Sequence, residues 1–160
     1  MNIGFIGLGI MGAPMAGHLM AGGHQIITFI HKTPAPKTLI ESGLEVVENA
    51  KEVAKNSEII IVMVPDTPQV QDVLFGRDSI AEGLSNGKLV IDMSSISPIE
   101  TKEFANVIKG RGCGYLDAPV SGGELGAKAA SLTIMVGGSE EDFSRAVSYT
   151  HLTLPTKWIV

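Results

Sequence analysis

The sequence predicts an α/β protein with a doubly wound, mostly parallel sheet. Short apolar runs alternate with helical stretches along most of the chain, as in βαβ units. The first apolar run also ends in a cluster of glycines that leads into a helix. The 160 residues, 44% hydrophobic and 18% charged, suit one globular domain and exclude intrinsic disorder.

Short apolar runs of four to seven residues are predicted to be the strands. The run at 58–64 is the most apolar and stops before Pro65, which predicts the most buried strand. The predicted strands span residues 2–6, 25–30, 44–47, 58–64, 88–92, 115–118 and 132–136.

Helical stretches separate these strands, and capping residues mark several of their ends. Asn49 is placed to cap the third helix. Ser97, Pro98 and Glu100 predict a capping box with proline at the first helical position. Ser139 precedes three acids, as at a helix start. The predicted helices span residues 11–21, 34–42, 50–55, 69–75 and 98–108, with a last one beginning at 139.

The composition limits which binding partners and which cellular compartment we expect for the protein. Twelve basic and 17 acidic side chains give a net charge of −5, and the basic ones are scattered. A single cysteine, Cys113, excludes a disulfide framework and a multi-cysteine zinc site. The longest apolar run, 59–64, is too short to span a bilayer, and the first residues do not resemble a leader. We therefore expect a soluble, cytoplasmic protein that binds neither nucleic acid nor membrane.

The segment Gly7-Leu8-Gly9-Ile10-Met11-Gly12 has the spacing G-x-G-x-x-G between a predicted strand and a predicted helix. Gly7 would permit the tight turn, Gly9 would let the backbone approach a pyrophosphate, and Gly12 would let the helix pack on the strand. The N–H groups at the helix start also favour phosphate. The segment predicts a Rossmann-type fold that binds NAD(P). A tight turn with incidental glycines is the alternative.

Basic residues follow the second predicted strand, where such folds often have an acid for the ribose 2′-hydroxyl. Residues 30–33 contain no acid, and Glu41 is the first one after the glycine segment. His31 and Lys32 could instead contact a 2′-phosphate, which favours NADP(H). They could equally be solvated side chains after a strand.

Three further loops follow predicted strands, and ligands bind at the carboxyl ends of parallel strands. Residues 63–67 either line a ligand-binding crevice or form an ordinary loop at the end of the strand. Ser94 and Ser95 contact a cofactor or satisfy the backbone of a turn. Residues 117–123 combine Ser121 with glycines whose N–H groups suit an anion, unless they form an ordinary loop.

Other reactive residue types are expected to be structural. His18 and His24 have no companion at metal-ligand spacing, and Cys113 has no evident base near it in the sequence.

Several of these segments together resemble the β-hydroxyacid dehydrogenase family, the group of 3-hydroxyisobutyrate and 6-phosphogluconate dehydrogenase relatives. Residues 5–12 resemble its cofactor loop, and residues 117–123 resemble its substrate signature D-A-P-V-S-G-G. The resemblance extends to about residue 147. A closer similarity to a branch that reduces small semialdehydes lies in residues 63–70, 73–76, 91–102 and 134–138.

The resemblance implies an NAD(P)H-dependent oxidoreductase with a small carboxylate substrate and a homo-oligomeric full-length form. Val64 and Pro65 would border the adenosine side, and Ser95 and Gln69 would contact the cofactor. With His31 and Lys32, the expected cofactor-binding residues are Gly7, Leu8, Gly9, Ile10, Met11, Gly12, His31, Lys32, Val64, Pro65, Gln69 and Ser95. The expected substrate-binding residues are Ser121, Gly122 and Gly123.

One part of the family pattern does not occur in this sequence. The family's general acid is a lysine in a G-x-G-x-x-x-K-x-x-N-type helix of a helical carboxyl-terminal domain, and no such motif is found. We expect that domain to be absent, name no catalytic residue, and expect the chain to turn over little by itself. A stand-alone, non-catalytic dinucleotide-binding module and a 3-hydroxyisobutyrate dehydrogenase-like enzyme are the alternatives.

The last residues also depart from the family pattern. We place the NAD(P)-binding domain at residues 1–147 and interpret 148–160 as a foreign tail produced by truncation or a frame artefact. A genuine terminal strand is the alternative.

Overall fold

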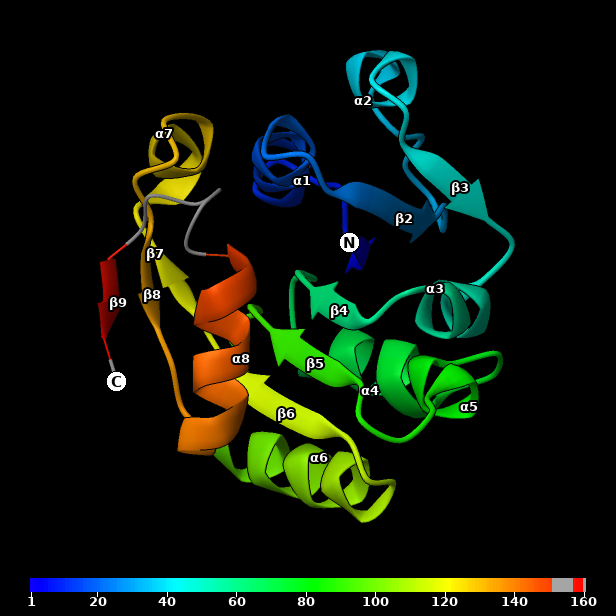
Figure 1. The fold of residues 1–160 in the computed structure, drawn as a ribbon, viewed down its shortest axis with the longest axis vertical. Coiled ribbons are helices and arrows are strands. Elements are labelled where there is room, and N and C mark those ends of the chain that lie inside the picture. The colour runs from blue at the N-terminus through cyan, green and yellow to red at the C-terminus, as the bar shows by residue number, and fades with distance from the viewer. Residues whose placement is uncertain (151–156, 160) are drawn as a thin grey trace.

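The computed structural model describes residues 1–150 and 157–159. Within them, six parallel strands form a central sheet in the order β3-β2-β1-β4-β5-β6 (Figure 1). The order reverses between β1 and β4, which confirms the predicted doubly wound, Rossmann-type fold. The strands are β1 (Asn2–Ile6), β2 (Gln25–Phe29), β3 (Glu45–Val47), β4 (Ile59–Val62), β5 (Leu89–Asp92) and β6 (Gly114–Asp117).

Strand register brings the carboxyl ends of four strands to one edge of the sheet. Ile6 pairs with Val62, Val62 with Asp92, and Asp92 with Asp117. Each is the last residue of its strand, so the loops that follow begin side by side. Ligands of open α/β sheets bind at this edge, which we call the carboxyl edge.

Helices cover both faces of the sheet (Figure 1). Side chains alternate between the two faces along each strand, so both faces carry apolar residues that the helices bury. Phe5 and Leu19 belong to the apolar cluster on the α1 face, whereas Ile60 and Phe104 belong to the cluster on the α6 face. Helices α7 and α8 share the first face, and α3, α4 and α5 share the second. The helices are α1 (Gly12–Ala21), α2 (Lys37–Glu41), α3 (Ala50–Asn56), α4 (Thr67–Phe75), α5 (Ile80–Gly83), α6 (Pro98–Gly110), α7 (Gly123–Lys128) and α8 (Glu140–Thr150).

Helix α3 is capped by side chains at both ends. The Asn49 side chain accepts a hydrogen bond from the Glu52 N–H at 3.0 Å, which confirms the predicted cap. At the other end, Lys88 Nζ donates to the carbonyl oxygens of Ala54 and Lys55. The groups that a short helix leaves unpaired at its ends thus gain partners.

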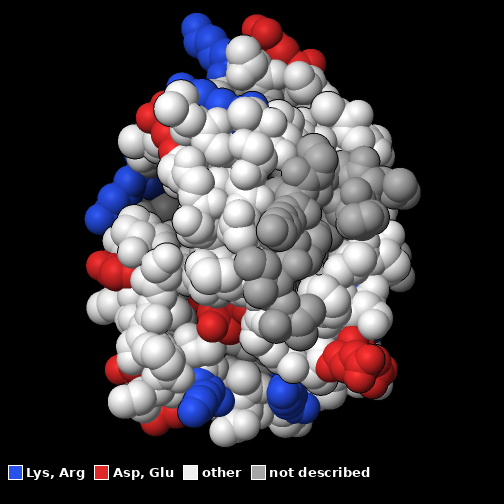
Figure 2. Space-filling model, turned by 90° about the vertical axis from the view of Figure 1, so that its left-hand side faces the viewer, with Lys and Arg blue, Asp and Glu red and all other residues white. Residues whose placement is uncertain are grey.

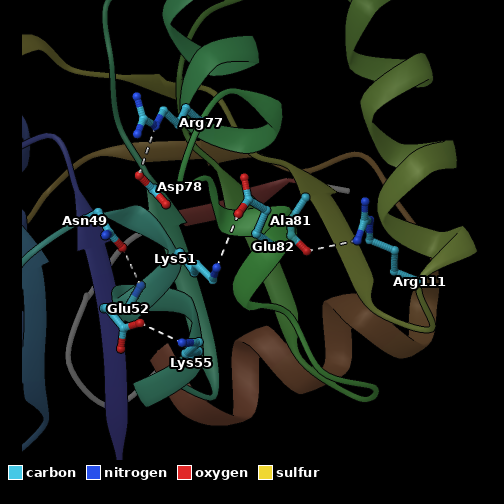
Figure 3. A network of polar contacts seen from close by, with 9 residues as sticks. All are labelled: Asn49, Lys51, Glu52, Lys55, Arg77, Asp78, Ala81, Glu82 and Arg111. Carbon is cyan, nitrogen blue, oxygen red and sulfur yellow. Dashed lines mark hydrogen bonds and ion pairs between the residues drawn. The ribbon is translucent and has the colours of Figure 1, made fainter.

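A cluster of polar contacts joins α3 to α5, and α5 to the segment before β6 (Figure 3). Lys51 pairs with Glu82 at 3.4 Å, and Arg111 Nη1 donates to the Ala81 carbonyl oxygen at 3.0 Å. Arg111 leads into β6, so its contact with Ala81 lies toward the amino ends of the strands. It supports the fold away from the carboxyl edge.

The predicted strand at 132–136 forms, but it lies outside the central sheet. Strand β8 (Thr133–Met135) pairs antiparallel with β7 (Val120–Ser121) and parallel with β9 (Lys157–Ile159). A bridge between Asp117 and Gly137 connects this small sheet to the end of β6. The short elements β7, α5 and α7 are not predicted by the sequence patterns.

The predicted starts of the last two long helices differ in their caps. Ser139 Oγ accepts a hydrogen bond from the Asp142 N–H at 3.2 Å, as predicted. Ser97 precedes α6, but within the described residues its side chain caps no backbone N–H. Its own N–H donates to Thr67 Oγ1 at 3.2 Å instead, so the reciprocal capping box does not form.

Helix α8 continues through residues 148–150, past the domain boundary predicted at 147. Of the predicted foreign tail, residues 151–156 and 160 lie outside the described part of the chain, and 157–159 form β9. The boundary and the origin of the tail stay predictions. None of the helices in the described ranges is long and apolar enough to cross a membrane.

Candidate functional site

The loops after β1, β4, β5 and β6 are held next to one another at the carboxyl edge. Backbone hydrogen bonds continue the strand pairing by one residue. The Met63 N–H donates to the Ile6 carbonyl at 2.8 Å, and the Met93 N–H donates to the Val62 carbonyl at 2.8 Å. The Ala118 N–H donates to the Asp92 carbonyl at 2.7 Å. The predicted cofactor loops therefore start from one rigid platform.

The three glycines after β1 have three different surroundings. Gly7 has a φ of +103°, and a Cβ there would overlap the carbonyl oxygen of Met63. A Cβ on Gly12 would overlap the Gly7 carbonyl oxygen. A Cβ on Gly9 would meet none of the described atoms within 4 Å. Gly7 and Gly12 thus build the turn, while Gly9 leaves open space beside the backbone.

Helix α1 begins at this open space. It runs for 10 residues from Gly12, with no acid in its first turn. Its first N–H groups and its dipole favour an anion. A dinucleotide pyrophosphate fits this arrangement, because Gly9, which has open space beside its backbone, lies three residues before the first residue of the helix. The nicotinamide of such a cofactor would supply or accept hydride.

The residues after β2 are exposed, as a cofactor-facing position requires. Strand β2 ends at Phe29, and both His31 and Lys32 lie exposed in the loop that follows. Beneath them, Thr28 Oγ1 donates to the Phe5 carbonyl oxygen at 2.7 Å, which fastens the end of β2 to β1. The loop with Lys32 thus starts beside the glycine loop.

The two serines after β5 have different environments. Ser94 is buried, and its Oγ accepts a hydrogen bond from the Val64 N–H at 3.0 Å. Ser95, like Pro65 and Gln69 in the neighbouring segment, is exposed. Of the two alternatives, Ser94 satisfies backbone, while Ser95 is free to face a ligand.

Three titratable residues, the buried Asp92 and Tyr115 and the half-buried Asp117, lie under these loops. Asp117 begins the predicted substrate segment, but the sequence patterns did not predict that the three lie near one another. Asp92 is fully buried; its Oδ1 accepts the Ser94 N–H at 3.0 Å and its Oδ2 accepts the Tyr115 hydroxyl at 3.1 Å. Burial raises the pKa of Asp92, and these hydrogen bonds oppose the increase. Burial and the neighbouring Asp92 raise the pKa of Asp117 to about 6.

The predicted substrate loop forms a turn between two short elements. Ser121 ends β7 and is exposed, Gly122 has a φ of +135°, and Gly123 begins α7 with a φ of +60°. Both glycines adopt backbone conformations that disfavour larger residues. The turn presents polar backbone at the surface, as an anion-binding loop requires.

His18 connects the two helices that follow the predicted binding loops. His18 Nε2 on α1 lies 3.0 Å from the Ala127 carbonyl oxygen and 3.1 Å from that of Lys128, so this nitrogen carries a proton to donate. These carbonyls end α7, the helix that begins at Gly123. Cys113 is also in a structural setting, because it is buried with Sγ 3.1 Å from the Ser85 carbonyl oxygen.

Comparisons with known proteins agree with this geometry. Residues 2–150 match the family model described as the NAD binding domain of 6-phosphogluconate dehydrogenase. The 2-hydroxy-3-oxopropionate reductase of Escherichia coli K12 is 53% identical over 146 residues, which cover 91% of this chain and 49% of that protein. A probable mitochondrial 3-hydroxyisobutyrate dehydrogenase of Dictyostelium discoideum is 40% identical over 148 residues, or 92% of this chain and 46% of that protein.

A solved structure has the same fold. The Mycobacterium tuberculosis 3-hydroxyisobutyrate dehydrogenase, solved with L-serine, superposes with a TM-score of 0.88 at 35% identity, covering 99% of this chain and 53% of that one. The chain spans about half the length of the relatives it matches. The predicted resemblance is confirmed: the chain belongs to the β-hydroxyacid dehydrogenase family through an NAD binding domain of the 6-phosphogluconate dehydrogenase type.

Proposed function

We propose that this chain is the dinucleotide-binding part of a reductase that transfers hydride between NAD(P)H and 2-hydroxy-3-oxopropionate, the semialdehyde of tartronate. The observation that carries the proposal is the contrast between crowded Gly7 and Gly12 and open Gly9 at the start of α1. The 53% identity to the Escherichia coli reductase supports the choice of substrate.

In this proposal the residues of the chain bind and orient the cofactor and the substrate. We assign the proton transfer to none of them. The N–H groups at the start of α1 hold the pyrophosphate, and exposed Ser95 and Gln69 contact the cofactor. Ser121, Gly122 and Gly123 hold the substrate carboxylate. The family's lysine motif does not occur in the sequence, so we expect these 160 residues to bind both ligands and turn over little.

We propose a preference for NADP(H), which the exposed pair His31 and Lys32 supports. Lys32→Ala should weaken NADPH binding about fivefold and leave NADH binding unchanged, because only NADPH has a 2′-phosphate to pair with the ammonium. Titration of the chain with each reduced cofactor measures both affinities. Lys102→Ala, at an exposed lysine on α6, is the matched control. Equal losses for both cofactors would contradict the preference.

The substrate is tested by binding small acids to the chain saturated with NADP+. Glycerate, the reduced product, should bind more tightly than 3-hydroxyisobutyrate, and Ser121→Ala should weaken it about fivefold by removing a hydroxyl donor. Ser131→Ala, at an exposed serine after α7, is the control. Tighter binding of 3-hydroxyisobutyrate would favour the second candidate function, which the Dictyostelium and mycobacterial relatives support.

A full-length form is proposed to be a homo-oligomer. On the face that α7, β8 and α8 form, most of the charged side chains lie toward the edge, and an acidic side chain lies near the middle (Figure 2). Leu125 of α7 is 83% exposed and Met135 of β8 is 43% exposed. The proposal rests on the family resemblance, and these two exposed apolar side chains support it.

A further inference from the structure

Two hydrogen bonds join the loop after β4 to the loop after β5. The Val64 N–H donates to Ser94 Oγ at 3.0 Å, and the Ser97 N–H donates to Thr67 Oγ1 at 3.2 Å. Each loop supplies one hydroxyl acceptor and one backbone donor. The two bonds bracket the stretch of each loop that contains an exposed candidate residue, Pro65 in one and Ser95 in the other.

The first of these bonds is anchored in the sheet. Ser94 is 1% exposed, and its N–H donates to Asp92 Oδ1 at 3.0 Å. The other carboxyl oxygen, Asp92 Oδ2, accepts the hydroxyl of Tyr115, a residue 2% exposed on β6. A continuous chain of hydrogen bonds therefore runs from β6 through the end of β5 to the loop after β4.

Ser94, Asp92 and Tyr115 are too buried to contact a ligand, so any influence on a cofactor must act through the exposed residues beside them. A loop that is already ordered loses less conformational freedom when a ligand binds, and its ligand binds more tightly. Buried, fully paired polar groups are a common way to fix such a loop.

We propose that Ser94 and Thr67 are positioning residues whose hydroxyls fix the two loops as one wall of the dinucleotide crevice, with Asp92 and Tyr115 as the buried anchor. This role rests on the proposed function, because it presupposes that the crevice binds a dinucleotide. It assigns a purpose to Ser94, Asp92 and Tyr115, which are too buried to touch the cofactor, and to the half-buried Thr67.

The test measures NADPH affinity of the 160-residue chain by titration for Ser94→Ala, Thr67→Val and the double variant. Each single change should raise Kd about fivefold, the equivalent of one net hydrogen bond. The double variant should raise Kd by less than the product of the two single effects, because both bonds brace the same pair of loops. Thr67→Ser, which keeps the hydroxyl, should restore wild-type affinity.

Ser57→Ala is the matched control. Ser57 is also a buried serine, but it lies at the amino end of β4, and its Oγ has no hydrogen-bond partner among the described residues. Its loss should leave Kd unchanged. Circular dichroism verifies that every variant is folded at the titration temperature.

The outcomes separate the two proposals. A wild-type chain that binds neither NADPH nor NADH overturns the proposed function together with this role. A wild-type chain that binds, with a double variant of unchanged Kd, overturns the positioning role alone. Single effects that multiply in the double variant, or an equal loss in Thr67→Ser, also contradict it.

Discussion

The three glycines of the loop between β1 and α1 have two different roles. Gly7 and Gly12 are required by the fold, since a methyl group on either would overlap a backbone carbonyl. Gly9 has open space in the described structure, so its lack of a side chain matters for what approaches from outside.

This difference predicts that glycine-to-alanine changes at the two positions affect stability to very different extents. Gly12→Ala should lower the free energy of unfolding by about 3 kcal/mol, because the added methyl group forces backbone atoms apart. Gly9→Ala should change it by less than about 0.5 kcal/mol. Urea unfolding measures both values. Equal destabilisation by the two changes would contradict the assignment.

Asp117 predicts how stability depends on pH. Its pKa in the folded chain is raised from the ordinary 3.8 to about 6, so the folded state holds this proton more tightly than the unfolded state. The resulting stabilisation is present below about pH 4 and is lost as the pH rises through 6.

Asp117→Asn should remove this dependence. The stability of the wild type relative to the variant should fall between pH 4 and pH 6 by about 1 kcal/mol, since solvent around a half-buried carboxyl screens part of the effect. Unfolding curves recorded across that pH range measure the difference. Two parallel pH profiles would mean that Asp117 titrates normally.

At the scale of elements, α3 has both an end cap and a surface ion pair, whose contributions to stability can be compared. Lys88 donates to the last carbonyls of α3 from a partly buried position, and burial lowers the pKa of its amine. Lys51 forms an ion pair with Glu82 in which both side chains are at least one-third exposed.

Lys88→Met should therefore cost about 1.5 kcal/mol of unfolding free energy, because two helix carbonyls lose their donor. Lys51→Met should cost less than about 0.5 kcal/mol, because water screens the exposed pair. Thermal unfolding of the two variants ranks them. A larger loss from Lys51→Met would show that the polar cluster of Figure 3 supports α3 more than its end cap does.

The elements that the sequence predicts are those with strong local patterns. The apolar run of β4, the glycine loop and the Asn49 cap depend on neighbouring residues alone, so each is visible in the sequence. Helix α5 has four residues, and α7 begins with glycine, so neither has a helical period to recognise. The two-residue strand β7 is likewise too short to show an alternation.

Across the whole molecule, the contacts that sequence patterns miss are those between distant residues. Tyr115 and Asp92 are 23 residues apart, and Val64 and Ser94 are 30 apart. Their hydrogen bonds depend on strand register, which places the carboxyl ends of β4, β5 and β6 side by side. The candidate site could thus be located from sequence as a set of loops, whereas its buried support could not.

The central claim is that these 160 residues form a dinucleotide site whose open position is Gly9. The most direct test is fluorescence titration of the chain with NADPH, comparing the wild type with Gly9→Ala. We expect saturable binding by the wild type and a Kd about tenfold higher for the folded variant, because the methyl group occupies the space nearest the pyrophosphate. Absence of saturable binding by the wild type, or identical affinities for the two proteins, would contradict the claim.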